Sequence, residues 1–243
     1  MKRPGCSCSP CPVYRTGVRA LLIANSVDAD PGFVGERFRH HGFSFTECFR
    51  EQPSDWPSLG GVDLVLLLGS EWSVYWDEVQ SSVNAECALV KTAHEQGIPV
   101  FGICFGSQIV AHALGGSVAR ATRPEVGWCS VQTDVPEAIA PGPWMQWHFD
   151  AFATPPGFRE LARSESGPQA VVGSRTFATQ FHPEATETIV ARWSAGDPAD
   201  LNRLGLSAAR LMDDTRAHVG RSRPAAGRIV DWYLDEVVGR SKR

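Results

Sequence analysis

Three short apolar runs, each followed by a segment with helical spacing, constrain the fold more than any other feature of this sequence. The runs are VRALLIAN (18–25), VDLVLLLG (62–69) and IPVFGI (98–103). Their length is typical of strands, and their nearly continuous apolar character is typical of strands buried on both faces of a sheet. Strands that alternate with helices at this spacing form crossover units, so the sequence predicts a largely parallel sheet and an α/β architecture.

The segments between these runs carry the signals of helix ends. Asp30 and Pro31 predict a helix start, with an N-cap followed by proline in the first turn, and Gly42 predicts the end of that helix. The next segment, FSFTECF (43–49), alternates as a strand does. Two further helices are expected at residues 77–96 and 106–114.

The second half of the chain differs in character. Within residues 127–181, the segments GWCSVQT, AVVGSRT and FATQFH lie between Gly and Pro turns and predict an antiparallel extension of the sheet. Beyond residue 186 the pattern is helical, with helices expected at LSAARLMDDTRAHV and AAGRIVDWYLDEVV. We therefore expect a single domain over residues 18–243, preceded by a disordered tail over residues 1–17.

Composition and charge exclude several classes of function. The 243 residues are 43% hydrophobic and 21% charged, which is typical of a soluble globular protein. The net charge of −4 gives no reason to expect nucleic acid as a partner. There is no run of 18 apolar residues, and the basic start of the chain lacks the apolar core of a signal peptide. These features predict a cytoplasmic protein without a membrane partner.

The cysteines indicate neither a disulfide framework nor a metal site. Seven cysteines are an odd number, and they are spread over a long chain. Cys6, Cys8 and Cys11 lie together near the start, but a structural zinc site needs a fourth ligand. We therefore expect no metal and no other cofactor.

Cys104 lies between Gly102 and Gly106, just after the third apolar run. A strand that turns sharply into a helix crowds side chains two positions from the corner, so glycine is favoured on both sides. The corner residue lies at the carboxyl end of a strand, where open α/β sheets bind ligands, and at a helix N-terminus, which favours an anion. The segment GICFG therefore predicts a nucleophile elbow that carries cysteine. The structural alternative is a small buried cysteine.

A thiolate nucleophile needs a base, and the base needs an orienting group. In TQFHPEAT (179–186), His182 stands at the tip of a strand that Pro183 would end, and Glu184 follows two residues later. Both side chains can lean to one side, so that the carboxylate holds the imidazole. The alternative is a histidine packed at a strand end, and the elbow cysteine favours the catalytic interpretation.

Together these residues resemble the class I (triad type) glutamine amidotransferases. GICFGSQ (102–108) is similar to the family's G-x-C-x-G-x-Q motif, and HPE (182–184) to its second motif, in the family's order. The resemblance implies a flavodoxin-like three-layer sandwich with a mostly parallel central sheet and an antiparallel extension. It also implies hydrolysis of the glutamine side-chain amide through a γ-glutamyl thioester. Cys104 would be the nucleophile. His182 would accept the proton of Cys104 and later protonate the leaving ammonia, and Glu184 would orient His182.

The resemblance extends to an oxyanion hole made of backbone N–H groups. One N–H would come from Phe105 and the other from Ser70, which follows Gly69 in the loop LLLGSEWSVYWDE (66–78). This loop resembles the G-G-P-x-S-V-Y loop of the family's guanylate-synthetase branch, and Gly69 is expected to touch the substrate. The chain departs from that pattern, because Ser70 and Glu71 stand where the branch has glycine and proline.

MQWHFD (145–150) resembles a W-x-x-H-x-D segment of the same branch, which holds the α-amino and α-carboxylate groups of the substrate. Asp150 is expected to face the ammonium, Trp147 and His148 to shape the pocket, and Gln108 to help hold glutamine. The alternative is an aromatic-rich edge strand with solvated polar ends. A nearby aromatic cluster rims the site, forms part of a partner surface or packs in the core, and core packing is favoured: Trp72, Tyr75 and Trp76.

Three functions follow from these residues. The first is a glutaminase that supplies ammonia to a partner synthetase, since the sequence shows no phosphate-binding loop of its own. The second is a free-standing hydrolase that acts on a γ-glutamylated amine. The third, an inactive binding or regulatory module, is disfavoured because all three residues of the triad are present.

Overall fold

The computed structural model describes residues 17–196 and 198–239, so the predicted tail at 1–17 and its three cysteines lie outside this part of the chain, apart from Gly17. The strands are β1 (Val18–Ala24), β2 (Phe43–Phe49), β3 (Leu64–Leu67), β4 (Val100–Ile103), β5 (Val118–Cys129), β6 (Gln132–Thr133), β7 (Trp144–Phe152), β8 (Arg159–Ser164), β9 (Gly167–Gly173) and β10 (Thr176–Thr179). The α-helices are α1 (Gly32–His40), α2 (Gln80–Glu95), α3 (Phe105–Ala113), α4 (Glu187–Gly196), α5 (Pro198–Arg203) and α6 (Ala208–Trp232). Short 3₁₀ and π turns are η1 (Pro53–Asp55), η2 (Asp77–Val79) and η3 (Tyr233–Val237).

Eight strands of the described residues form one mixed sheet in the order β2-β1-β3-β4-β10-β9-β8-β6. The first five are parallel, and their order is that of the flavodoxin-like doubly wound sheet. The strands β9, β8 and β6 continue the sheet in antiparallel fashion. The predicted parallel sheet with its antiparallel extension is therefore confirmed.

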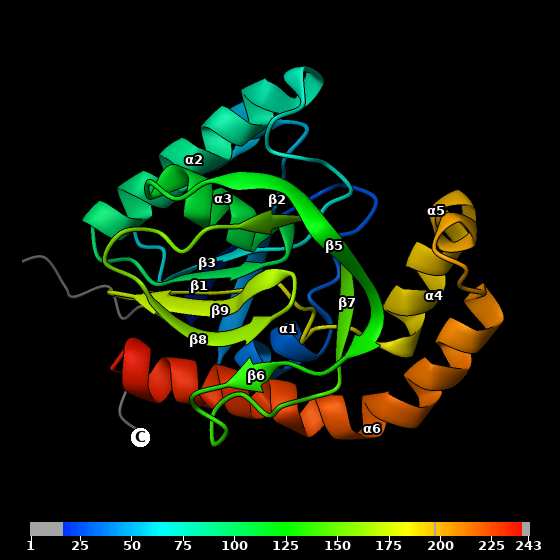
Figure 1. Cartoon of the computed structure of the whole chain (residues 1–243). Coiled ribbons are helices and arrows are strands. Elements are labelled where there is room, and N and C mark those ends of the chain that lie inside the picture. Colours follow the sequence, from blue (N-terminus) through cyan, green and yellow to red (C-terminus); the bar gives the residue numbers. More distant parts are fainter. Residues whose placement is uncertain (1–16, 197, 240–243) are drawn as a thin grey trace, which may run out of the picture.

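One part of the predicted extension belongs elsewhere. Residues 127–129, which start the segment GWCSVQT, lie in β5, and β5 pairs with β7 in a separate two-stranded sheet (Figure 1). The register of this pair shifts between Arg120 and Glu125, and much of β5 is exposed. A strand that buries so little surface lacks the second covered face that a central strand of the main sheet has.

Helices cover both faces of the parallel strands, which gives three layers (Figure 1). In β1, Ala20 and Leu22 face a core shared with α1 and α6, whereas Leu21 and Ile23 face a core shared with α2 and α3. Successive residues of a strand point to opposite faces, so both faces of β1 must be apolar. This double burial explains the continuous apolar runs, and the predicted three-layer sandwich is confirmed.

Two helix predictions need correction. The first helix begins at Gly32, and Asp30 accepts a hydrogen bond from the Gly32 N–H at 2.9 Å without being the N-cap residue. The segments LSAARLMDDTRAHV and AAGRIVDWYLDEVV are joined in one helix, α6, which contains Pro224 in its interior, and the end of the second segment continues into η3. Its buried stripe packs against α4 at one end and α1 at the other, and this tertiary packing outweighs the local cost of proline.

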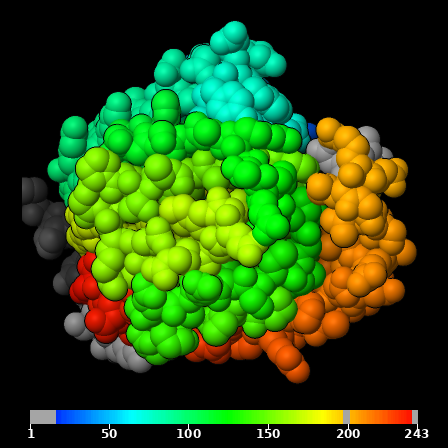
Figure 2. All heavy atoms as spheres, viewed as in Figure 1, coloured from blue at the N-terminus to red at the C-terminus, as the bar shows by residue number. Residues whose placement is uncertain are grey.

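The surface seen in Figure 2 is formed mainly by the strands from β5 to β9, coloured green to yellow-green, with α2 above them. Among the described residues, none of the helices combines the length and the apolar character that crossing a membrane requires. The carboxyl ends of β1, β3, β4 and β10 lie at one edge of the sheet, because these strands are parallel neighbours. The candidate site is built on this edge.

Candidate active site

Cys104 occupies a strained corner between β4 and α3, with φ 52° and ψ −109°. Its N–H donates a hydrogen bond to the Thr179 carbonyl at 2.8 Å, which ties the corner to β10. A Cβ at Gly102 would lie 2.7 Å from the Gly106 carbonyl oxygen, and one at Gly106 would overlap the Leu67 carbonyl oxygen. Neither position has space for a side chain, so the predicted strand-to-helix elbow is present.

His182 follows the end of β10 and is held from two sides. Its backbone N–H donates a hydrogen bond to the Met145 carbonyl of β7 at 2.8 Å, and its ring Nδ1 lies 2.6 Å from the Glu184 Oε1. Both side chains are buried. Within the described part of the chain, the other ring nitrogen, Nε2, has no hydrogen-bond partner. A buried polar atom without a partner is uncommon and needs a functional or structural explanation.

The charges around His182 favour its protonated form. Burial by itself lowers the pKa of an imidazole, but the Glu184 carboxylate and the Cys104 sulfur more than offset burial and raise the pKa of His182 well above its ordinary value. The arrangement therefore favours an imidazolium beside the Cys104 sulfur.

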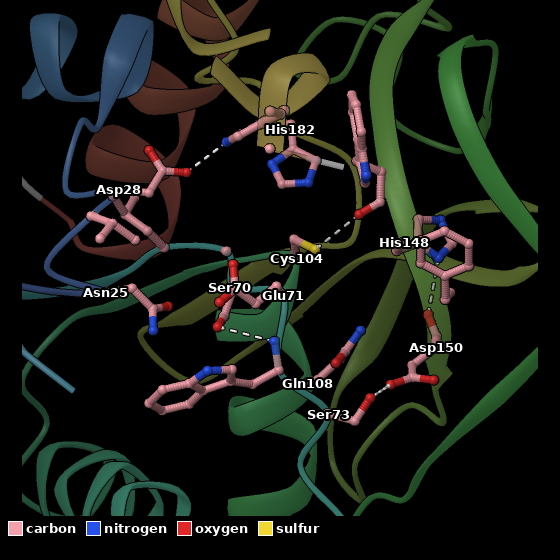
Figure 3. Close-up of a pocket in the computed structure, with 18 of the residues that line it drawn as sticks. Asn25, Asp28, Ser70, Glu71, Ser73, Cys104, Gln108, His148, Asp150 and His182 are labelled. Carbon is pink, nitrogen blue, oxygen red and sulfur yellow. Dashed lines mark hydrogen bonds between the residues drawn. The ribbon is translucent and has the colours of Figure 1, made fainter. Parts of the chain in front are cut away.

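Cys104 and His182 converge against Gly69, which follows β3. A Cβ at Gly69 would lie 3.0 Å from the His182 Cε1 and 3.6 Å from the Cys104 Cβ, so a larger residue there would press on both. The Cys104 thiol points to the Trp147 carbonyl, at 3.8 Å. Figure 3 shows His182 next to Cys104, with Ser70 on one side and Gln108 and Asp150 on another.

A cavity of about 750 Å³ opens above these residues. The cavity is lined by nearly all of the site residues predicted from the sequence, namely Gly69, Ser70, Cys104, Gln108, Trp147, His148, Asp150, His182 and Glu184. Phe105 is absent from the cavity wall, and its ring is fully buried. The sequence implicated only its backbone N–H, and in the described residues neither this N–H nor that of Ser70 donates a hydrogen bond.

Asp150 and His148 lie on β7 and are buried, so the solvated polar ends of the alternative interpretation are wrong, although β7, in a two-stranded sheet, is an edge strand. The Asp150 carboxylate accepts hydrogen bonds from the Ser73 hydroxyl and, at 2.8 Å, from the Tyr75 hydroxyl. Both ring nitrogens of His148 are engaged, Nδ1 with the Asp150 carbonyl at 2.9 Å and Nε2 with the Glu125 carboxylate at 3.1 Å. His148 thus shapes the wall and holds β7 in place.

The aromatic cluster after β3 also differs from the prediction. Tyr75 is 46% exposed and Trp76 is 39% exposed, and both Trp72 and Trp76 line the cavity. The favoured interpretation of core packing is therefore wrong for Tyr75 and Trp76. The Trp72 and Trp76 rings lie at the cavity because η2 begins only at Asp77 and α2 follows it. The residues before Asp77 therefore stay in the loop above the sheet edge.

The sequence reasoning missed three residues near the site. Arg120 lines the cavity, 3.9 Å from Asp150, and its guanidinium lies over the Phe149 ring. Trp193 packs on His182, with ring centroids 4.6 Å apart. Arg50 is fully buried and contacts the carbonyl of Gly69. None of them lies in a recognisable motif, although the charge of Arg50 directly after a strand was a signal that it could have a partner at that sheet edge.

Comparison with known families is decisive for the class of protein. Residues 57–191, more than half of the chain, match the family model described as glutamine amidotransferase class-I. The chain belongs to the class I glutamine amidotransferase family. The resemblance of its two motifs to that family is therefore confirmed.

Two curated relatives illustrate how much of the chain is shared. A glutamine-hydrolyzing GMP synthase subunit from Sulfurisphaera tokodaii is 36% identical over 140 residues, which are 54% of this chain and 71% of that protein. The glutamine-hydrolyzing GMP synthase of Aquifex aeolicus is 36% identical over 123 residues, which are 46% of this chain and 24% of that protein. The chain thus spans about a quarter of the length of such a GMP synthase.

Solved structures share the fold over nearly the whole chain. A glutamine amidotransferase of Thermotoga maritima has a TM-score of 0.77 at 26% identity, covering 91% of this chain and 98% of its own. A second glutamine amidotransferase, from Methylobacillus flagellatus, has a TM-score of 0.76 at 22% identity, covering 91% of this chain and 95% of its own. At 22% identity, this second likeness concerns the fold alone.

Proposed function

We propose that this amidotransferase hydrolyses the side-chain amide of glutamine through a γ-glutamyl thioester on Cys104. The observation that supports this most strongly is the buried pair of His182 and Glu184 beside an elbow cysteine, with the His182 Nε2 unpartnered among the described residues. This geometry supplies a nucleophile, a proton carrier and an orienting carboxylate, which are the three parts of a catalytic triad.

In the first half of the reaction, the Cys104 thiolate attacks the amide carbon and the carbonyl oxygen takes the negative charge. The Ser70 and Phe105 N–H groups, which donate no hydrogen bond within residues 17–196 and 198–239, can bind this oxyanion. The protonated His182 then gives its proton to the nitrogen, the carbon–nitrogen bond breaks, and ammonia leaves. In the second half, His182 takes a proton from the water that attacks the thioester, and the carbon–sulfur bond breaks. The product loses its acid proton to solvent as glutamate, and the Cys104 thiolate and the protonated His182 are restored.

The far end of the cavity fits the α-amino and α-carboxylate groups of the substrate. Asp150 is buried and carries a carboxylate that can accept more hydrogen bonds than the two it receives. Arg120, 60% exposed at its side chain, provides a cation beside it for a carboxylate. Gln108 also lines this end, and its Nε2 lies 3.4 Å from the Gln180 Oε1. Asp150, Arg120 and Gln108 are therefore the proposed substrate ligands.

The similarity to a glutamine-hydrolyzing GMP synthase subunit supports a separate synthetase as the consumer of ammonia. Such a partner would act in the cytoplasm, the location that we retain as a prediction. No cofactor is needed for the thioester chemistry, because the nucleophile, the base and the oxyanion donors are all protein groups.

One observation favours a second candidate, a free-standing hydrolase of γ-glutamyl amides. The cavity wall also includes Val27, Asp28, Arg192 and Trp193, and Trp193 packs on the His182 ring. Ammonia alone does not fill that space, whereas a larger amine does. An inactive module has no comparable support, because the three residues of the triad lie together.

The test compares L-glutamine with a panel of γ-glutamyl amides as substrates of the purified chain, with released glutamate as the readout. Glutamine turnover that disappears in Cys104→Ala supports the primary proposal. Turnover of a larger amide with little action on glutamine would replace it with the second candidate. Full activity in a folded Cys104→Ala protein would contradict both.

A further inference from the structure

Arg50, the residue that directly follows β2, is completely buried beneath the proposed oxyanion loop. Its Nε donates to the Glu86 carboxylate of α2 at 2.9 Å, and its Nη1 donates to the Asn25 side chain at 2.7 Å. The same guanidinium reaches two consecutive carbonyls of the loop, Leu68 at 3.1 Å and Gly69 at 2.8 Å. Burying a charge costs free energy unless the charge is paired and hydrogen-bonded. The partners of the buried Arg50 cation therefore indicate its role.

The bond to the Gly69 carbonyl fixes the direction of the next N–H. In a planar trans peptide, the C=O and the N–H point in opposite directions. The Gly69 carbonyl points to Arg50, which lies outside the cavity wall, while Gly69 and Ser70 themselves line the cavity. The Ser70 N–H is therefore turned away from Arg50 and toward the side on which Cys104 lies. If this peptide rotated, its carbonyl oxygen would face the cavity and repel an oxyanion.

Arg50 also contacts the residue that carries the second donor. Its guanidinium carbon lies 5.1 Å from the centroid of the Phe105 ring, a cation–π contact inside the core. Phe105 is the first residue of α3 and directly follows Cys104. One side chain thus touches both of the peptide segments that supply the proposed oxyanion donors.

We propose that Arg50 is a positioning residue that fixes the Gly69–Ser70 peptide with its N–H toward Cys104, and so keeps the oxyanion hole assembled. This role rests on the proposed function. It also explains how the loop keeps its shape with Ser70 and Glu71, although it lacks the second glycine and the proline of the guanylate-synthetase branch. The cation below the loop fixes the peptide plane that those residues do not fix.

The test needs a variant that removes the cation and still folds. Arg50→Met alone would leave the Glu86 carboxylate buried without a partner, which is strongly destabilising. The double variant Arg50→Met with Glu86→Met removes both charges, and apolar replacement of a buried pair is often tolerated. Arg50→Lys is a second variant, since an ammonium keeps the charge but lacks the planar fork that spans several acceptors.

The control is a second forked Arg–carboxylate pair, formed by Arg37 of α1 and Asp231 of α6 at 2.7 Å. The variant Arg37→Met with Asp231→Leu also replaces a charged pair by apolar residues, without contact to the oxyanion loop. This pair is about one-third exposed, and Asp231 also contacts the His41 ring. Thermal unfolding and circular dichroism verify that each variant is folded.

Two readouts separate positioning from general structural damage. The first is kcat and KM for the amide substrate that the wild-type protein hydrolyses best. The second is the rate at which iodoacetamide alkylates Cys104, followed by peptide mass spectrometry. Alkylation forms a sulfur–carbon bond and expels iodide, so it needs the thiolate but places no charge on a carbonyl oxygen.

We expect kcat to fall roughly 100-fold in the double variant, the scale of losing one oxyanion donor, with KM nearly unchanged. The Cys104 alkylation rate should be retained, Arg50→Lys should be intermediate, and the control should behave as the wild type. Unchanged kcat in the folded double variant overturns the proposal, and so does a parallel loss of kcat and alkylation. If the double variant does not fold, Arg50→Lys decides by the same criteria. Wild-type protein that hydrolyses no γ-glutamyl amide refutes the proposed function itself, and Arg50 then has no oxyanion to serve.

Discussion

Replacing Glu184 by glutamine tests the electrostatic part of the triad with almost no change in shape. The 2.6 Å contact between the His182 Nδ1 and the Glu184 Oε1 joins two buried groups, so little solvent screens it. A glutamine oxygen still accepts the Nδ1–H bond, but without the charge. A hydrogen bond to a charged group is stronger than a neutral one by about 1.4 kcal/mol, which corresponds to roughly a tenfold fall in kcat/KM.

The same change moves the pH profile in a defined direction. Glu184 raises the pKa of His182, so its removal lowers that pKa. The imidazolium that protonates the leaving group is then lost at a lower pH, and the alkaline limb of kcat/KM shifts toward neutral pH. The assay is kcat/KM for released glutamate across the pH range.

Glu187→Gln is the matched control for this prediction. Glu187 is half-exposed on α4, and its carboxylate lies 3.8 Å from the Arg216 Nε. The substitution Glu187→Gln therefore makes the same chemical change outside the cavity. The control should keep both the rate and the profile of the wild type. A Glu184→Gln protein with an unchanged alkaline limb would show that Glu184 does not act on His182 as described.

Three other outcomes follow from distances and burial in the site. Gly69→Ala should lower kcat about tenfold, measured at saturating substrate, because its Cβ would press on the His182 ring at 3.0 Å, and unchanged kcat would contradict that geometry. Asp150→Asn should raise KM roughly tenfold with little effect on kcat, since the proposed ammonium partner loses its charge; an effect on kcat alone would contradict this role. Brief iodoacetamide treatment at neutral pH should leave Cys48 and Cys87 unmodified by peptide mass spectrometry, because burial raises the pKa of each thiol to about 11, and rapid labelling there would contradict their burial.

The sequence was most informative at positions where the local structure permits only one type of residue. The corner at Cys104 requires glycine two positions before and two positions after it, since a side chain at Gly102 or Gly106 would collide with backbone. The β1 run is nearly all apolar because both of its faces are covered. These local constraints leave a visible pattern in the chain, so the elbow and the parallel sheet could be predicted.

Features that depend on tertiary contacts were not predictable in this way. The helical pattern predicted separate helices at LSAARLMDDTRAHV and AAGRIVDWYLDEVV, but packing against α1 and α4 keeps α6 continuous through Pro224. The pairing of β5 with β7, which brings Arg120 opposite Asp150, requires knowledge of the strand register. Arg50 meets partners from three separate segments of the chain, and no local spacing reveals such a cluster.

The central claim is that Cys104 becomes covalently acylated during turnover. Rapid acid quenching of the protein with L-glutamine or the best γ-glutamyl amide, followed by peptide mass spectrometry, tests it directly. The account predicts a γ-glutamyl group on the peptide that contains Cys104, at levels that rise when the second half of the reaction is slowed. Turnover with no acyl group on that cysteine, or with the group on another residue, would contradict it.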